Sequence, residues 1–169
     1  MERKIITTKD GSKTIHFPGI NESYHSQHGA LQEALHVFIK SGLSHYLNEN
    51  SATAKLNILE VGWGTGLNTI LAFDFMQQNF PSVKVSYTGL EAYPVAMDEV
   101  HALKYAELDE IQQHRHVYLA MHEANWNEKV DINSNFSLQK LQTTVQDWLQ
   151  NNHSKPYFDL IFFDAFGPR

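Results

Sequence analysis

The rhythm of apolar positions along the chain predicts a hairpin followed by alternating strands and helices. Two short stretches flank a Lys9-Asp10-Gly11 turn, and several compact apolar runs end at turn residues, as is typical of strands. Elsewhere apolar residues recur every three or four positions, which is typical of helices. The predicted strands are Lys4–Thr8, Lys13–Phe17, Leu56–Val61, Val83–Leu90, Phe136–Leu141 and Phe158–Phe163, and the predicted helices are Ser26–Leu47, Leu67–Phe80, Val95–Tyr105 and Leu108–Glu123.

Local signals refine these boundaries. Ser26 is predicted to cap the first helix, and Gly42 to split or bend it. Pro94 suits the first turn of the third helix. Residues 125–135 and 150–156 are polar and are predicted to be loop or turn. Because the compact apolar strands alternate with helices, the sequence predicts an α/β fold with a largely parallel sheet.

Composition narrows the possible functions. The chain has 169 residues, 42% of them hydrophobic and 19% charged, which predicts one cytoplasmic globular domain. The absence of cysteine rules out disulfides, thiolate metal sites and a cysteine nucleophile. The net charge of −6 disfavours extensive binding to phosphates but permits small-molecule chemistry or the docking of one exposed nucleotide.

The sharpest motif lies at residues 59–68, Leu-Glu-Val-Gly-Trp-Gly-Thr-Gly-Leu-Asn. Glycines at alternate positions between a buried strand and a helix let the backbone turn tightly and approach a ligand. The spacing is not that of the dinucleotide fingerprint, which makes a nicotinamide dehydrogenase the least favoured interpretation. Glu60 before the glycines suits a cationic cofactor, and Glu91 at the next strand end suits ribose hydroxyls. This combination is the pattern of methyltransferases that use S-adenosylmethionine.

A second motif covers residues 158–168, Phe-Asp-Leu-Ile-Phe-Phe-Asp-Ala-Phe-Gly-Pro. Its apolar strand delivers Asp164 to the edge where α/β sheets bind ligands. Asp164 could instead serve as a turn or cap residue. Phe166 and Pro168 could form a wall for a planar group.

Together with the upstream segment at residues 24–38, which begins Tyr24-His25-Ser26, these motifs resemble the MnmC-like methyltransferases. The resemblance extends over essentially the whole chain and is closest to the stand-alone MnmD type. It implies methylation of the amine of 5-aminomethyl-(2-thio)uridine at the tRNA wobble position, with S-adenosylmethionine as cofactor and tRNA as partner. It also implies a hairpin and helical extension at residues 1–50 and a Rossmann-like core at residues 51–169.

The resemblance implies a role for each matching residue. Glu60, Gly62, Gly64, Gly66 and Asn68 would line the methionine end of the cofactor, and Glu91 would hold the ribose. Asp164 would lie beside the methyl group and the amine as the candidate base, with His25 as the alternative base, and Tyr24 and His25 would close over the site.

Two positions depart from the family pattern. Trp63 replaces a smaller side chain within the glycine motif. Thr144 takes the place of the acid that would address the adenine amino group, and Asp147 follows three residues later, so adenine recognition is assigned to Asp147 with Thr144 as the alternative.

Other functional classes stay open at this stage. The acidic charge is compatible with a small-molecule N- or O-methyltransferase of the same fold, and a non-catalytic S-adenosylmethionine-binding module is a further alternative. No metal site is predicted, because His114, His116 and His122 fit no known ligand spacing and are expected at the surface.

Methyltransferase sheets of this class normally have seven strands, and the last predicted strand here corresponds to the fourth. The sequence is therefore expected to be a fragment with an intact cofactor turn, an unpaired sheet edge beside Asp164, and poor or absent activity. A second copy of the chain is one candidate to cover that edge.

Overall fold

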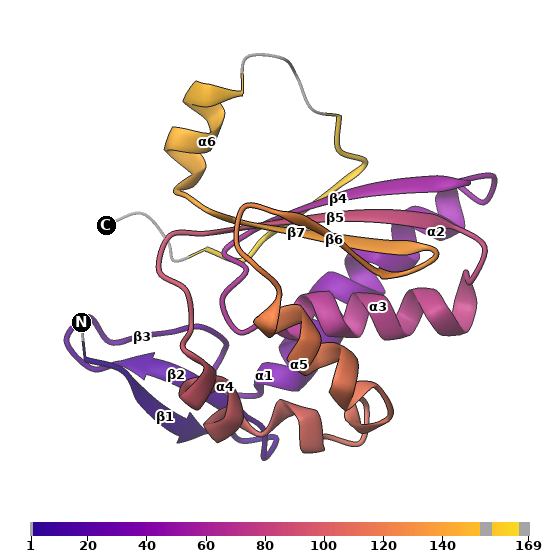
Figure 1. Ribbon diagram of the computed structural model, residues 1–169. Coiled ribbons are helices and arrows are strands. Elements are labelled where there is room, and N and C mark those ends of the chain that lie inside the picture. Colours follow the sequence, from indigo (N-terminus) through magenta and orange to yellow (C-terminus); the bar gives the residue numbers. More distant parts are fainter. Residues whose placement is uncertain (1, 153–156, 166–169) are drawn as a thin grey trace.

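In a computed structural model of the protein, the described residues form two sheets (Figure 1). The structure describes residues 2–152 and 157–165. The strands are β1 (Lys4–Thr7), β2 (Lys13–Phe17), β3 (Glu22–Ser23), β4 (Lys55–Val61), β5 (Lys84–Glu91), β6 (Lys129–Asn133), β7 (Phe136–Gln142) and β8 (Leu160–Phe163). The helices are α1 (Ala30–Glu33), the π-helix η1 (Ala34–Ser44), α2 (His45–Glu49), α3 (Leu67–Asn79), α4 (Met97–Leu103), the 3-10 helices η2 (Tyr105–Glu107) and η3 (Gln112–His114), α5 (Arg115–Glu123) and α6 (Val145–Asn151).

The central sheet confirms the predicted α/β class. Its strand order is β6-β7-β5-β4-β8, in which β7, β5, β4 and β8 run parallel and β6 pairs antiparallel with β7. α3 and α5 lie on one face of the sheet and α6 on the other (Figure 1). Because β4 lies between β5 and β8 and runs parallel to both, the carboxyl ends of β4, β5 and β8 meet at one edge.

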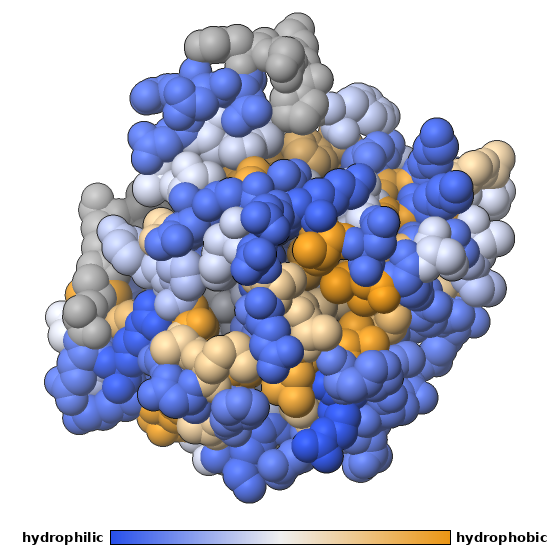
Figure 2. Space-filling view, in the orientation of Figure 1, coloured by the Kyte–Doolittle hydropathy of each residue, from blue (hydrophilic) through white to orange (hydrophobic). Residues whose placement is uncertain are grey.

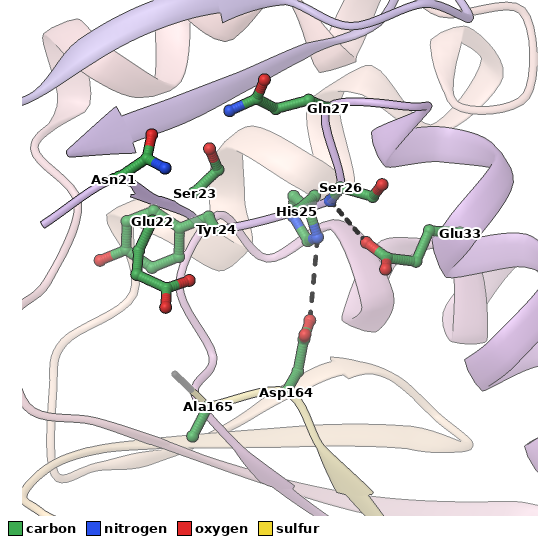
Figure 3. Close-up of a pocket in the computed structure, with 10 residues that line it drawn as sticks. All are labelled: Asn21, Glu22, Ser23, Tyr24, His25, Ser26, Gln27, Glu33, Asp164 and Ala165. Carbon is green, nitrogen blue, oxygen red and sulfur yellow. Dashed lines mark hydrogen bonds and ion pairs between the residues drawn. The ribbon is translucent and has the colours of Figure 1, made fainter. Parts of the chain in front are cut away.

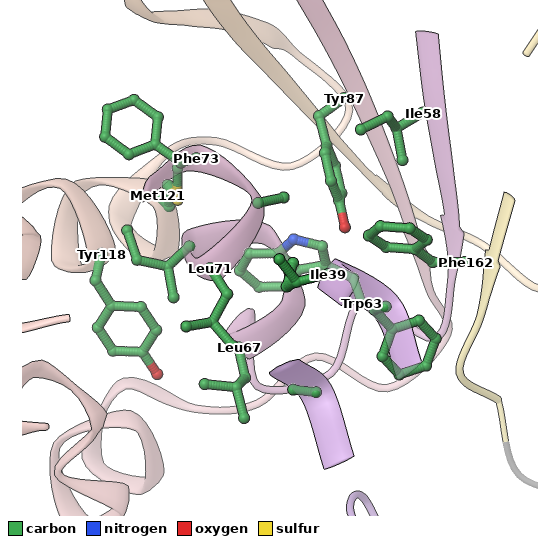
Figure 4. Close-up of a cluster of buried hydrophobic side chains, with 14 of the residues drawn as sticks. Ile39, Ile58, Trp63, Leu67, Leu71, Phe73, Tyr87, Tyr118, Met121 and Phe162 are labelled. Atoms are coloured by element: carbon green, nitrogen blue, oxygen red, sulfur yellow. The ribbon is translucent and has the colours of Figure 1, made fainter. Parts of the chain in front are cut away.

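The main core lies between the sheet and the α3 face (Figure 4). Alternate residues of β4, such as Ile58, point into it, while Leu59 and Val61 join a smaller cluster on the α6 face. On β8, Phe162 is buried, whereas Ile161 and Phe163 are 58% and 66% exposed. Within the described residues β8 pairs only with β4. The face of the molecule seen in Figure 2 carries mainly hydrophilic side chains.

The predicted first helix is wrong at its start. It begins at Ala30 rather than near Ser26, and no side chain within the helix caps it. Its first N–H groups, those of residues 30, 31 and 32, are instead bonded by Thr8 Oγ1, Ser12 Oγ and Asp10 Oδ2 of the β1–β2 turn. The cap comes from a turn distant in sequence, so local pattern could not reveal it.

The prediction that Gly42 splits the helix is wrong, and the alternative that it bends the helix stays a prediction. The π-helix η1 runs through it and continues into α2. A Cβ at Gly42 would lie 3.4 Å from the ring of Phe162, so the glycine allows this helix and β8 to pack closely.

Three further predictions need correction. The segment 108–123 is α-helical only from Arg115, after the 3-10 helix η3. The polar segment 125–135 contains β6, which is held by its pairing with β7 rather than by an apolar pattern. Within the predicted turn region from residue 150, α6 extends to Asn151, and residues 153–156 lie outside the described residues. No helix within the described residues is long and apolar enough to cross a membrane.

The turn that caps α1 gives the first testable prediction. Asp10→Ala is expected to lower the free energy of unfolding by about 1 kcal/mol, because Asp10 bonds the N–H groups of Ser12 and Gln32. Chemical denaturation measures the loss.

The pKa of Asp10 falls from 3.8 to about 2, because hydrogen bonds from its neighbours outweigh the opposing effect of burial. Its stabilisation is therefore fully present above pH 3.8 and is lost as the pH falls through 2.

Asp109→Ala is the matched control, because Asp109 is exposed and bonds only the Gln112 side chain in the described structure. An equal loss of stability in both variants would contradict the capping role of Asp10.

Candidate active site

Three carboxylates converge where β4, β5 and β8 end. Glu60 lies one residue before the end of β4, Glu91 ends β5, and Asp164 directly follows β8. The register pairs Val61 with both Leu90 and Phe163, which places these acids at the same sheet edge. The sequence predicted that these three acids lie at strand ends, and the structure brings the three strand ends together.

Asn68, in the first turn of α3, links two of these carboxylates. Its Nδ2 donates to Glu60 Oε1 at 2.9 Å and to Asp164 Oδ2 at 2.7 Å. Its Oδ1 is buried and has no hydrogen-bond partner among the described residues. Since buried polar atoms are normally paired, Asn68 Oδ1 is available to a donor on a bound ligand.

Glu60 is buried and accepts hydrogen bonds from side chains of α3 and β5. Besides Asn68, Thr69 Oγ1 and the Tyr87 hydroxyl donate to its Oε2, at 3.1 and 2.8 Å. Burial first, and then the charge of Asp164, raise the pKa of Glu60 from 4.5 to about 8 against the effect of these hydrogen bonds. A buried negative charge in this position is costly and would be stabilised by a cation nearby.

The glycine turn brings other segments close to the backbone. Gly62 and Gly64 have φ of +87° and +48°. A Cβ on Gly62 would lie 2.5 Å from the backbone oxygen of Asp164, and one on Gly64 would lie 2.7 Å from the ring of Tyr24. Side chains at these positions would therefore be strained by both conformation and contact. The structure shows the tight turn predicted at these two glycines, and their contact with a ligand stays a prediction.

Glu91 is buried and holds the glycine turn from the side. Its Oε2 accepts from the N–H of Gly64 at 2.9 Å, and its Oε1 accepts from the N–H of Tyr93 at 2.8 Å. The hydroxyl of Tyr24 donates to the carbonyl of Tyr93 at 3.4 Å. Tyr24 thus spans from the glycine turn to the loop after β5, and its closing over a bound ligand stays a prediction.

A pocket of about 330 Å³ lies in front of Asp164 (Figure 3). Residues 21–27, Glu33, Asp164 and Ala165 line it. Glu33 Oε2 accepts from the N–H of Ser26 at 2.7 Å, and His25 points toward Asp164, with Nδ1 and Oδ2 3.8 Å apart. The lining is rich in acidic and polar groups, which suits an amine or another cationic group.

Burial shifts the pKa values of His25 and Asp164, which face each other in the pocket. It lowers the pKa of His25 from 6.5 to about 4. It raises the pKa of Asp164 from 3.8 to about 7, opposed by the hydrogen bond from Asn68 and assisted by the charge of Glu33. Asp164 therefore exchanges a proton near neutral pH, which is the property of an effective general base.

Asp147 and Thr144 do not join this cluster of acids. Thr144 caps α6, accepting from the N–H of Asp147 at 3.0 Å and donating from its own Oγ1 to Asp147 Oδ2 at 2.7 Å. Their predicted alternative roles toward adenine have no contact that supports them. Phe166 and Pro168 lie outside the described residues.

Sequence reasoning missed several residues of the site. Tyr87 and Thr69 hold Glu60, Glu33 lines the pocket, and Thr65 Oγ1 contacts His25 Nε2 at 2.8 Å. Thr65 lies within the glycine motif and Tyr87 faces inward on β5, which are the signals that could have identified them.

Two predictions made around the site need comment. His122 is not at the surface as expected, because it is 8% exposed and its Nε2 lies 3.0 Å from the carbonyl oxygen of Thr65. The unusual Trp63 packs against Gly66 and Gly89, with Lys140 Nζ 5.0 Å from its ring centre. Among the described residues, no group of three His, Cys, Asp or Glu side chains could hold a metal ion.

Comparisons with known proteins support the resemblance. No protein-family profile matches the sequence. The bifunctional protein MnmC of Methylobacillus flagellatus, which functions in tRNA 5-methylaminomethyl-2-thiouridine biosynthesis, is 26% identical over 149 residues, covering 86% of this chain. The crystal structure of MnmC2 from Aquifex aeolicus aligns with 99% of this chain with a TM-score of 0.74 and 23% identity, so the two share a fold. The chain spans 23% of the length of that MnmC and 50% of the Aquifex chain.

Proposed function

We propose that this chain is the catalytic part of an N-methyltransferase that uses S-adenosylmethionine to methylate the amine of 5-aminomethyl-(2-thio)uridine at the tRNA wobble position. The observation that carries the proposal is the cluster of Glu60, Glu91 and Asp164 around a glycine turn, within a chain that resembles MnmC. A cytoplasmic location follows from the substrate and belongs to the same proposal.

The residues fit the cofactor in charge and shape. S-adenosylmethionine, when bound, supplies a methyl group attached to a positively charged sulfur. Glu60 and Asp164 have raised pKa values, which a nearby cation would lower. Asn68 Oδ1 has no hydrogen-bond partner among the described residues and could accept a hydrogen bond from the cofactor. The carboxylate of Glu91, at the end of β5, is suited to a pair of ribose hydroxyls.

The chain contributes positioning and a base. A primary amine is mainly protonated at neutral pH and becomes nucleophilic only after losing a proton. Asp164, at the back of the pocket, can accept that proton because its pKa lies near 7. Tyr24 and His25 line the same pocket and would limit the orientations of the amine and exclude water.

The acidic surface does not oppose a tRNA substrate of this kind. Wobble bases are unpaired and can be turned outward into a pocket, so recognition of one base needs few phosphate contacts. The pocket in front of Asp164 is open to such a base, and Figure 3 shows its polar lining.

A labelled-methyl assay tests the function. The protein expressed from its complete reading frame is incubated with labelled S-adenosylmethionine and a cell extract, with and without ribonuclease. Label in tRNA that ribonuclease abolishes supports the proposal. Label that resists ribonuclease indicates a small-molecule methyltransferase, and cofactor binding without any transfer indicates a non-catalytic module.

Glu91 gives the second testable prediction. Glu91→Gln is expected to weaken cofactor affinity by roughly tenfold, because an amide replaces a carboxylate that would accept charge-assisted hydrogen bonds from the ribose. Isothermal titration calorimetry measures the change. Glu110→Gln, at an exposed position, is the control and should bind as the native protein does. Equal affinity in the two variants would remove Glu91 from the cofactor site.

A further inference from the structure

Trp63, within the glycine turn, is buried against neighbours that fix the plane of its indole. The residue is 2% exposed, and a Cβ on Gly89 would overlap the Cδ1 and Cγ atoms of its ring. Lys140 Nζ lies 5.0 Å from the ring centre, and the centre of the His122 ring lies 4.7 Å away. Because these groups face the indole from β5, β7 and α5, the direction of its N–H is fixed.

That N–H points at the first turn of α3. Trp63 Nε1 lies 2.8 Å from Thr69 Oγ1, and both residues are buried. An indole N–H can only donate a hydrogen bond, so the Thr69 hydroxyl accepts it, whatever the protonation state of the groups around them. The contact ties the glycine turn to the helix that follows it.

The same hydroxyl of Thr69 contacts Glu60. Thr69 Oγ1 donates to Glu60 Oε2 at 3.1 Å. An ionised carboxylate can only accept, and a threonine hydroxyl has a single proton, so this proton is directed to Glu60 when Glu60 is charged. The indole N–H occupies another side of the Thr69 oxygen. It thereby opposes rotation of the hydroxyl toward the helix backbone, which threonine side chains in helices often contact.

Glu60 Oε2 thus has two donors, and one of them depends on Trp63. The Tyr87 hydroxyl is the other donor, at 2.8 Å, while Asn68 Nδ2 donates to Oε1 at 2.9 Å. Hydrogen bonds in a chain polarise one another, so the indole N–H makes the Thr69 hydroxyl a stronger donor to the carboxylate. Trp63 therefore contributes to the stability of the ionised Glu60 without touching it.

We propose that Trp63 is a positioning residue: its indole N–H, acting through the Thr69 hydroxyl, holds Glu60 in the orientation and the ionised form that receive the positively charged cofactor. This inference rests on the function proposed above. No proton is transferred along the chain, because each group keeps its own hydrogen atom. The effect of Trp63 is therefore expected on cofactor affinity rather than on kcat.

Two other titratable groups act on Glu60. Asp164, which follows β8, raises the pKa of Glu60 by its charge, and Tyr87, on β5, lowers it by its hydrogen bond. From α3, Asn68 and Thr69 lower it by hydrogen bonds of uncharged groups. All four groups remain when Trp63 is replaced, so a change in the Glu60 titration on that replacement reports on the indole.

Trp63→Phe tests the inference, because phenylalanine keeps an aromatic ring but has no N–H. Calorimetric titration with S-adenosylmethionine should show an affinity weaker by roughly fivefold, a size typical of coupling within one hydrogen-bond network. Thr69→Val should weaken the affinity by roughly tenfold or more, because a hydrogen bond to a charged group is lost. With both replacements the affinity should equal that of Thr69→Val alone, since the indole then has no hydroxyl to hold.

A packing role for Trp63 would give a different result. The smaller ring would then weaken cofactor binding by the same factor whether residue 69 is threonine or valine. Thr69→Ser keeps the hydroxyl, so in that background Trp63→Phe should again cost roughly fivefold in affinity.

Trp126→Phe is the matched control. The Trp126 ring packs edge-on against Trp63, with the ring centres 5.7 Å apart, and among the described residues its indole N–H donates no hydrogen bond. The replacement therefore makes the same chemical change in the same cluster without affecting Thr69. This control should bind the cofactor as the native protein does.

Carbon NMR of the Glu60 carboxyl group in the ligand-free protein gives a readout that needs no cofactor. With the signal assigned against Glu60→Gln, the native protein should titrate near pH 8. The midpoint should be higher in Trp63→Phe, because a weaker donor stabilises the ionised form less. In the Thr69→Val background, Trp63→Phe should leave the midpoint unchanged.

The outcomes separate the two proposals. Independent losses of affinity from the two replacements, or a Glu60 titration that is the same in the native protein and in Trp63→Phe, would overturn the inference. If S-adenosylmethionine does not bind the native protein, the proposed function fails, and the titration of Glu60 still decides whether Trp63 acts on it through Thr69.

Discussion

Asp164→Asn is expected to lower the rate of methyl transfer by roughly 10²–10⁴-fold, the range typical for loss of a general base. Asparagine has nearly the same shape and can still accept the hydrogen bond that Asn68 donates at 2.7 Å. It cannot take a proton from the substrate amine. The loss should therefore appear in kcat, with a smaller change in cofactor affinity.

Single-turnover kinetics with modified tRNA measures this loss, and thermal unfolding shows whether the variant is folded. Asp131→Asn, an exposed carboxylate on β6, is the control and should retain the native rate. In the native protein kcat/KM for the cofactor should rise with pH up to about 7 and then level, because it reports the raised pKa of Asp164 in the cofactor-free protein. A folded Asp164→Asn protein with native kcat would remove Asp164 from the chemistry.

Gly62→Ala is expected to destabilise the protein by about 2–5 kcal/mol and to abolish cofactor binding. The left-handed backbone at φ +87° costs an alanine roughly 1–2 kcal/mol, and the contact of 2.5 Å with the Asp164 carbonyl adds an overpacking cost of about 1–3 kcal/mol. The glycine turn cannot move away easily, because the N–H groups of Gly62 and Trp63 each donate to Leu90 O. The Asp164 backbone is held too, because its N–H donates to Val61 O.

Denaturant unfolding and calorimetric titration with the cofactor measure these effects. Gly19→Ala is the matched control, since a Cβ there meets nothing within 4 Å and φ lies outside the left-handed region. If Gly62→Ala were as stable as Gly19→Ala, the close approach of the Asp164 backbone to the glycine turn would be wrong.

The sequence predicted the parts of the fold that depend on local pattern. The strands from Leu56 and Val83 and the helix from Leu67 lie within a residue or so of their predicted positions, because compact apolar runs bounded by turn residues mark buried strands, and the glycine turn and Pro81 bound the helix. The glycine turn and the strand-end acids were found for the same reason: they are defined by the elements that they follow.

The rest depends on contacts between distant segments. The cap of α1 comes from the turn around Asp10, and β6 is a strand only because β7 pairs with it. His122 is buried because Thr65 offers it a carbonyl oxygen, which no local pattern records. In the site, the hydrogen bond between Thr65 and His25 joins residues forty positions apart, so only the folded structure could show it.

Mass spectrometry of wobble nucleosides tests the central proposal most directly. Cells that lack this protein are compared with the same cells expressing the native gene or Asp164→Asn, and tRNA nucleosides are quantified. We predict that 5-aminomethyl-(2-thio)uridine accumulates without the protein or with Asp164→Asn, and that the native gene restores 5-methylaminomethyl-(2-thio)uridine. Unchanged wobble nucleosides in cells that lack the protein would contradict the account.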